Sequence, residues 1–336
     1  MRVGTGDNMY EWIEDWAKTP DTECARTGWS HHGIVVSESG EVYSGHQDAP
    51  IVQVFDTDGK FLRSWPSDCA DTHGLTLVNE GGTEYLWIAD NGAKRHPSTA
   101  YEYPETDAKV IGKAVKKTMD GQTVLELATP PHAAYGESDY KPTWVAVNEV
   151  RNGGNGDIWV TDGYGGNLVH RYSSDGEYLS TISGEEGDAG AFDCPHAIFI
   201  DIRKGVPELY VADRSNGRVQ VYDADGKWLR VFGEDFLTSP SGFVAYGDTL
   251  VIAELNARIT ICGADDRPRT YLGENGSVTD VAGWPNNHNE RGESVRSVLL
   301  EPGKFNSPHG MAVDAHGNLY VAEWLIGGRS IKLAKV

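Results

Sequence analysis

The chain has 336 residues, of which 39% are hydrophobic, and its formal net charge is −21. A chain this acidic is repelled by nucleic acid and by anionic membrane surfaces, so we expect neither as a partner. No apolar run approaches the ~20 residues of a membrane span, and no apolar stretch typical of a secretion signal follows Met1, which predicts a cytoplasmic protein.

The first predicted element is a short helix in NMYEWIEDWAKT, residues 8–19. Beyond it, helical periodicity is scarce, whereas the 40 glycines and 15 prolines favour many short strands joined by tight turns. The four cysteines lie far apart without a CxxC pair, which is typical of free thiols rather than of a disulfide framework.

From residue 30 onwards the chain repeats itself. Phrases such as SHHGIVV, THGLTLV, CPHAIFI and SPHGMAV open a predicted strand, and a second strand follows that ends in an acid, as in LWIAD, IWVTD, LYVAD, LVIAE and LYVAE. Turn sequences such as SSDGE and DADGK separate these strands and the two that follow them. The pattern is typical of a four-stranded antiparallel unit that recurs along the chain.

Six copies of this unit begin near His32, His73, Thr143, His196, Ser241 and His309. Six such units predict an all-β fold, a six-bladed β-propeller that forms a single domain over residues 1–336, with its ring closed in part by the N-terminal segment. Longer spacings predict insertions near residues 97–124 and 263–303, the second of which could cover the channel mouth. The first strand of each blade lines the central channel, so its entry residue faces the axis.

Histidines occupy three of the entry positions, on alternate blades. Because alternate blades of a sixfold ring lie about 120° apart, His73, His196 and His309 are predicted to converge on the axis. Three histidines with an open position are typical of catalytic zinc, although a single histidine at a strand entry is more often a structural residue. His32 is a possible fourth imidazole, either as a ligand or as a support for the ligands. His46, which replaces the strand-ending acid in the first repeat, is a further possible site residue.

The spans DIWVTDGYGGNLVHRYSSDGEYLSTISGEE, FDCPHAIFI and ELYVADRSNGRVQVY resemble the NHL-repeat propeller of peptidylglycine amidating lyase, the peptidyl-α-hydroxyglycine α-amidating lyase. The resemblance is strongest over residues 141–232. It implies that His73, His196 and His309 bind zinc, that Tyr164 is the catalytic tyrosine and that Arg214 is the active-site arginine. In that family, zinc and the tyrosinate act on the hydroxyl of a carbinolamide, whose C–N bond then breaks.

The chain also departs from that family. Gly310 stands where an aspartate helps to hold calcium, so structural calcium is not expected, and Gly165 replaces a disulfide cysteine. A second arginine of the family has no counterpart near residues 46–51. These differences imply retained metal chemistry with changed substrate recognition, in a bacterial relative that acts on a small molecule rather than on a peptide.

The residues themselves allow the same chemistry. A phenol beside a metal ion and a guanidinium loses its proton more readily, so Tyr164 is a candidate general base. Arg214 is a candidate for binding a carboxylate, a carbonyl or a developing oxyanion. The leading interpretation is therefore a metal-dependent lyase that cleaves a C–N or C–O bond.

Two other interpretations remain open at this point. One is a lactonase or hydrolase built on a calcium site, and the other is a non-catalytic NHL scaffold without a metal. A packing role remains open for Tyr164, and an inter-blade salt bridge remains open for Arg214. The acids that end the second strands are interpreted as architectural, because they recur in nearly every blade. Lys94, Arg95 and His96 could add a basic rim for an anionic substrate.

Overall fold

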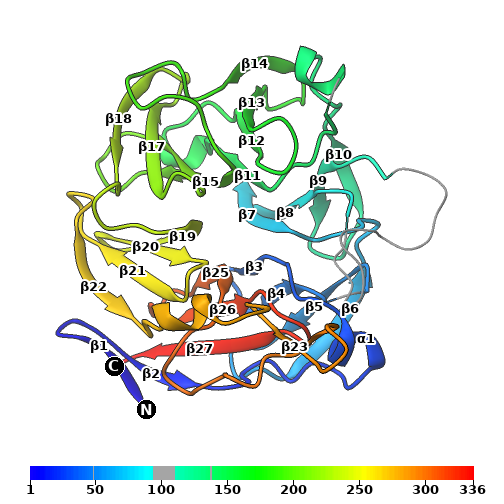
Figure 1. The fold of residues 1–336 in the computed structure, drawn as a ribbon. Helices are drawn as coiled ribbons and strands as arrows, with labels where there is room; N and C mark the ends of the chain where they lie inside the picture. Colours follow the sequence, from blue (N-terminus) through cyan, green and yellow to red (C-terminus); the bar gives the residue numbers. More distant parts are fainter. Residues whose placement is uncertain (48, 94–109, 137) are drawn as a thin grey trace.

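The computed structural model describes residues 1–47, 49–93, 110–136 and 138–336. Six antiparallel sheets are arranged in a ring, and the first strand of each lies nearest the centre (Figure 1). The fold is thus the predicted six-bladed β-propeller, with four antiparallel strands in each blade and a fifth strand added at the outer edge of the last blade. Residues 97–109 of the insertion predicted near 97–124 lie outside the described residues, as do the basic residues 94–96.

The first three blades follow the repeat order of the sequence. Blade one contains β3 (Ile34–Val36), β4 (Val42–Gly45), β5 (Ile51–Phe55) and β6 (Phe61–Pro66). Blade two contains β7 (Gly74–Glu80), β8 (Thr83–Asp90), β9 (Lys113–Thr118) and β10 (Thr123–Glu126). Blade three contains β11 (Trp144–Val147), β12 (Ile158–Asp162), β13 (Leu168–Tyr172) and β14 (Tyr178–Ile182).

The last three blades complete the ring. Blade four contains β15 (Pro195–Asp201), β16 (Glu208–Asp213), β17 (Arg218–Asp223) and β18 (Trp228–Phe232). Blade five contains β19 (Pro240–Tyr246), β20 (Thr249–Glu254), β21 (Arg258–Cys262) and β22 (Pro268–Leu272). Blade six contains β25 (Pro308–Val313), β26 (Leu319–Glu323) and β27 (Arg329–Lys335), together with two N-terminal strands.

Those two strands are β1 (Arg2–Thr5) and β2 (Asn8–Ile13), and β2 pairs with β27 so that the two ends of the chain close the ring (Figure 1). The helix predicted over residues 8–19 is therefore wrong. Tyr10 and Trp12 are buried, whereas Glu11 and Ile13 are exposed. This alternation has the period of a strand, and the open edge of β27 supplies the hydrogen-bonding partner.

Little regular structure lies outside the sheets. The described residues contain one short helix, α1 (Glu23–Thr27), capped by the Thr22 side chain, and the 3-10 turns η1 (Ala133–Gly136), η2 (Val150–Asn152) and η3 (Gly276–Asp280). Both predicted insertions include a strand that belongs to a blade. The range 97–124 contains β9, and the range 263–303 contains β22, so the segments outside the blades are shorter than predicted. The second insertion also carries the small hairpin β23 (Asn287–His288) and β24 (Ser294–Val295). No helix among the described residues is long and apolar enough to cross a membrane.

The acids that end the second strands have the architectural role expected of them. Asp213 accepts a hydrogen bond from the Asp193 amide at 2.8 Å and pairs with Arg218. Glu254 pairs in the same way with Arg258, and Glu323 pairs with Arg329. Buried carboxylates of this kind are stabilised by the amides and guanidinium groups that surround them.

Candidate metal centre

His73, His196 and His309 stand at the inner edge of blades two, four and six, and each is at most 1% exposed. His73 directly precedes β7, while His196 and His309 are the second residues of β15 and β25. The register of β15 shifts at His196, and that of β25 shifts at His309. A β-bulge of this type redirects a side chain, here from the sheet toward the channel axis.

The three imidazoles meet at the axis. Their ring centroids are 4.9 Å apart for His73 and His196, 4.7 Å for His73 and His309, and 4.9 Å for His196 and His309. The near-equal distances reflect the threefold arrangement of alternate blades. The structure therefore brings together the three histidines that the repeat pattern singled out.

A fourth imidazole joins this group, but it belongs to His31 and not to His32. The ring of His31 lies 4.4 Å from that of His73 and 4.8 Å from that of His309. One nitrogen from each of the four histidines lies within 4.8 Å of the others. Because neighbouring residues of an extended segment point in opposite directions, His31 joins the imidazole group, whereas the His32 side chain lines a cavity between blades one and six.

Backbone carbonyls hold the outer nitrogen of each axial histidine. Nδ1 of His73 lies 2.7 Å from the Thr143 carbonyl, and Nδ1 of His196 lies 2.8 Å from the Ser241 carbonyl. Nδ1 of His309 lies 3.4 Å from the His32 carbonyl. The acceptors are the entry residues of the next blades, so the ring of blades fixes each tautomer and turns each Nε2 inward.

His31 has a different support. Its Nδ1 lies 3.1 Å from Oδ2 of Asp71, which also accepts a hydrogen bond from the Asn91 side chain. All three residues are buried. A carboxylate partner orients an imidazole and raises its basicity. Asp71 therefore favours metal binding through the other ring nitrogen of His31, Nε2.

Burial keeps the axial imidazoles uncharged. It lowers the pKa of His73, His196 and His309 well below the usual 6.5, and the neighbouring imidazoles and Arg214 lower it further. The neutral imidazole is the form that binds a metal ion. The group therefore offers several nitrogen lone pairs at neutral pH without the cost of removing protons.

Tyr164 reaches the centre of this group from blade three. Its hydroxyl oxygen lies 3.0 Å from Nε2 of His31, 3.3 Å from Nε2 of His73 and 3.0 Å from Nε2 of His196. Arg214, from blade four, donates from Nη1 to the same oxygen at 3.2 Å, and its guanidinium lies 5.3 Å from the centre of the tyrosine ring. Both side chains are half-buried and lie between the histidines and solvent.

The donor set fits a transition-metal ion. Imidazole nitrogens suit zinc, iron, copper and nickel, whereas calcium prefers oxygen. His73, His196 and His309 would hold the ion, with His31 and the Tyr164 oxygen close enough to serve as further ligands. Gly310, which follows His309, brings no carboxylate to this point.

His46 does not join the group. Its Nδ1 accepts a hydrogen bond from the Ala49 amide at 3.0 Å, directly after β4. The strand-ending acids of the other blades accept backbone amides in the same way. His46 therefore performs the architectural role of the acid that it replaces.

The sequence reasoning missed His31, Asp71, Asn91 and Trp324. Asn91 and Trp324 follow Asp90 and Glu323, which is the position that Arg214 has after Asp213. The ring of Trp324 lies 6.0 Å from that of His31, and Trp284 of the second insertion lies 6.0 Å from Trp324. The residue that follows each strand-ending acid therefore indicates which side chains surround the histidine group. Through Trp284, the second insertion contacts one of these side chains, Trp324.

Comparisons with known proteins agree with the repeat pattern. The chain is 29% identical to human NHL repeat-containing protein 3, over 96% of this chain and 83% of that protein. It is 30% identical to peptidyl-alpha-hydroxyglycine alpha-amidating lyase 1 of Drosophila melanogaster, over 84% of this chain and 48% of that protein. The resemblance expected from the sequence is therefore confirmed.

Among solved structures, a streptogramin B lyase superimposes with a TM-score of 0.58 over 96% of this chain and 97% of that chain. The identity is 15%, so this likeness shows the fold alone. No family model matches the chain. Similarity to amidating lyases, together with the four-histidine group, fits a metal-dependent lyase.

Proposed function

We propose that the chain is a metal-dependent lyase, with zinc as its metal, that cleaves a C–N or C–O bond of a small hydroxylated molecule. The observation that carries the proposal is the position of the Tyr164 hydroxyl, in contact with the Nε2 atoms of three histidines and with the Arg214 guanidinium. A tyrosine that served only for packing would not require its hydroxyl to contact three imidazoles and a guanidinium.

A bound metal ion would supply a positive charge that polarises a substrate hydroxyl or carbonyl. Arg214 adds a second positive charge beside the phenol, and both charges favour the phenolate of Tyr164. The phenolate accepts the proton of the substrate hydroxyl. The C–O bond becomes a carbonyl, the adjacent C–N or C–O bond breaks, and the leaving group departs with that electron pair and gains a proton.

Arg214 also supports substrate binding. Its planar guanidinium can donate two parallel hydrogen bonds to a carboxylate or a carbonyl oxygen. The histidines are buried, and Tyr164 and Arg214 stand in front of them. Because the four histidines are buried, a small molecule is favoured over a folded protein.

The test is a panel of α-hydroxyglycine amides, lactones and oxidised sugars, assayed with untagged protein before and after a chelator and again after zinc is restored. Turnover of an α-hydroxy substrate that disappears and returns with zinc supports the proposal. Arg214→Lys should lower kcat/KM by 10-fold or more, because an ammonium lacks the planar fork. The matched control is Arg267→Lys, at an exposed arginine that pairs with Asp235.

Two results count against the proposal. One is a zinc-loaded protein that turns over no member of the panel. The other is turnover that survives the chelator unchanged and is equal in wild type and Arg214→Lys. Turnover of lactones alone would place the protein among the hydrolases.

A further inference from the structure

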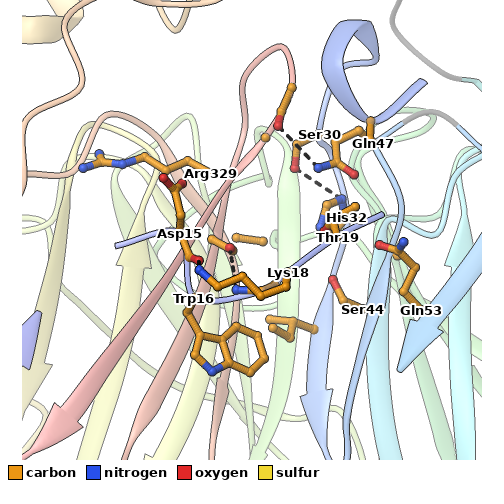
Figure 2. Close-up of a pocket in the computed structure, with 18 of the residues that line it drawn as sticks. Asp15, Trp16, Lys18, Thr19, Ser30, His32, Ser44, Gln47, Gln53 and Arg329 are labelled. Atoms are coloured by element: carbon orange, nitrogen blue, oxygen red, sulfur yellow. Dashed lines mark hydrogen bonds between the residues drawn. The ribbon is translucent and has the colours of Figure 1, made fainter. Parts of the chain in front are cut away.

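A second cavity lies between blades one and six, and none of the four histidines of the candidate metal centre lines it. Its volume is about 580 Å³, and residues 15–21 of the N-terminal segment help to enclose it (Figure 2). Trp16, Lys18, His32, Ser44 and Gln53 are among the residues that line it. Ligand sites in proteins have volumes of ~300–1,000 Å³, so the cavity is large enough for a small organic molecule.

The cavity exists because the first repeat departs from the others. At the position of Ser44 in VYSGH, blades three, four and five carry Val160, Val211 and Ile252. His46 replaces the strand-ending acid, so blade one also lacks the acid and arginine pair of blades four, five and six. Smaller side chains and a missing ion pair leave space beside the second and third strands.

Gln53 shows that this space is polar. It stands opposite Ser44 in the register of β4 and β5, and its side chain is directed into the cavity (Figure 2). Gln53 is 3% exposed and Ser44 is 7% exposed, yet neither side chain hydrogen-bonds to any part of the chain that the structure describes. Buried polar groups nearly always have hydrogen-bonding partners.

The equivalent positions in three other blades confirm that this is unusual. Opposite Val160, Val211 and Ile252 stand His170, Gln220 and Thr260. Each of these is hydrogen-bonded within the protein: His170 to Tyr135, Gln220 to the Gly190 carbonyl and Thr260 to Glu254. Only in blade one, among these four, does the third-strand polar side chain face an open space.

The charge of the walls indicates the sign of a ligand. The lining side chains include four cations, Lys18, Arg26, Arg296 and Arg329, and two carboxylates, Asp15 and Asp21. Arg26 pairs with Asp21, and Arg329 pairs with Glu14 and Glu323. That leaves two cations and one carboxylate in the wall.

Lys18 and Arg296 are the two remaining cations. Lys18 donates to the Asp15 carbonyl at 2.7 Å, and Arg296 donates to the Ile326 and Gly328 carbonyls. Neither forms an ion pair with a carboxylate of the described chain. In a chain of net charge −21, such cations at the wall of a polar cavity are an arrangement suited to an anion.

We propose that this cavity binds a small organic anion, a carboxylate or phosphate that also carries hydroxyl groups. Lys18 and Arg296 would bind the charged group, and Ser44 and Gln53 would hydrogen-bond to the hydroxyl groups. The site is separate from the proposed catalytic centre.

Isothermal titration calorimetry with citrate, gluconate and inorganic phosphate tests the proposal, and glucose is the uncharged control. We expect saturable binding of at least one anion and none of glucose. Comparing the affinities for citrate and gluconate with that for inorganic phosphate shows whether the cavity prefers a carboxylate or a phosphate. Arg296→Gln and Lys18→Gln should each weaken the binding about 10-fold or more, because a hydrogen bond to a charged group is lost.

Ser44→Val is the sharpest variant, because it installs the valine that blades three and four carry at this position. It should abolish binding and leave the melting temperature unchanged or higher. Arg267→Gln, an exposed arginine outside the cavity, should bind as wild type does. Binding that none of the three cavity variants changes would overturn the proposal, as would the absence of binding by every anion. Binding that is lost only in Arg214→Lys would place the anion at the histidines and overturn it as well.

Discussion

The same six inner strands build two unlike ends of one channel. At the histidine end, formed by His31, His73, His196 and His309, four imidazoles, a phenol and a guanidinium converge. At the apolar end, beyond these histidines, the strands surround a cavity of about 270 Å³ lined largely by aliphatic and aromatic side chains. Phe243, Ile198 and Met311 are among them. The difference shows that the candidate site residues stand at the first residues of the inner strands, whereas the remaining residues of these strands pack in the core and stabilise the fold.

β-Bulges explain how one inner strand can direct a polar side chain toward the axis and also pack apolar side chains in the core. Each of β15, β19 and β25 shifts register at its second residue, which is His196, Ser241 or His309. After the shift, regular alternation resumes and the apolar side chains pack between blades. Substitutions at the two ends should therefore separate chemistry from stability.

The largest separation is expected for Tyr164→Phe. Phenylalanine keeps the ring packing and removes only the ionisable oxygen, so kcat on a substrate found in the panel should fall by about 10²–10⁴. Metal content should stay as in wild type. Tyr172→Phe, in the same blade and hydrogen-bonded to the Ala128 carbonyl, is the control and should keep its turnover. Equal kcat in wild type and Tyr164→Phe would make the tyrosine a packing residue.

The apolar end should respond in the opposite way. Phe243 is 7% exposed and packs in the core between blades four and five. Phe243→Ala should lower the free energy of unfolding by about 3–5 kcal/mol, because a large buried ring is lost. Denaturant titration measures this loss, and elemental analysis should find wild-type metal content. Loss of metal from the folded variant would show that the two ends are not independent.

A smaller effect is expected at Asp71, which supports His31 and which the sequence did not indicate. Asp71→Asn keeps the shape of the side chain but removes the charge that orients His31. Supporting residues of this kind contribute about 10–100-fold to metal affinity, and competition with a chromogenic chelator measures the change. Asp248→Asn, in an exposed pair with Arg269, is the control. An unchanged affinity in Asp71→Asn would remove His31 from the metal site.

The smallest effect concerns pH and the metal-free protein. The folded-state pKa of His196 lies well below 6.5, so below pH 6.5 the unfolded chain binds a proton that the folded chain does not. His196 should therefore cost about 1.4 kcal/mol of stability per pH unit as the pH falls from 6.5 to 5. His196→Asn should remove that part of the slope, whereas Phe243→Ala should leave the slope as it is. Parallel curves for wild type and His196→Asn would contradict the assignment.

The features that the sequence predicted correctly are those that recur in several blades, and the features that it missed occur only once. Recurring strand entries indicated the propeller and placed three histidines on alternate blades, with Tyr164 and Arg214 beside them. The doublet His31 and His32 could not be resolved, because only the direction of the extended segment decides which ring faces the axis. Asp71 joins His31 from another blade, a contact that no local spacing encodes. The N-terminal strand depends on the open edge of β27, more than 300 residues away.

The most direct measurement is elemental analysis of wild-type protein purified without a histidine tag, beside the variant in which His73, His196 and His309 are all alanine. We expect one transition-metal ion, zinc in our proposal, per wild-type chain and none in the folded triple variant. Wild-type protein with calcium alone or with no metal, or a triple variant with full metal content, would contradict it.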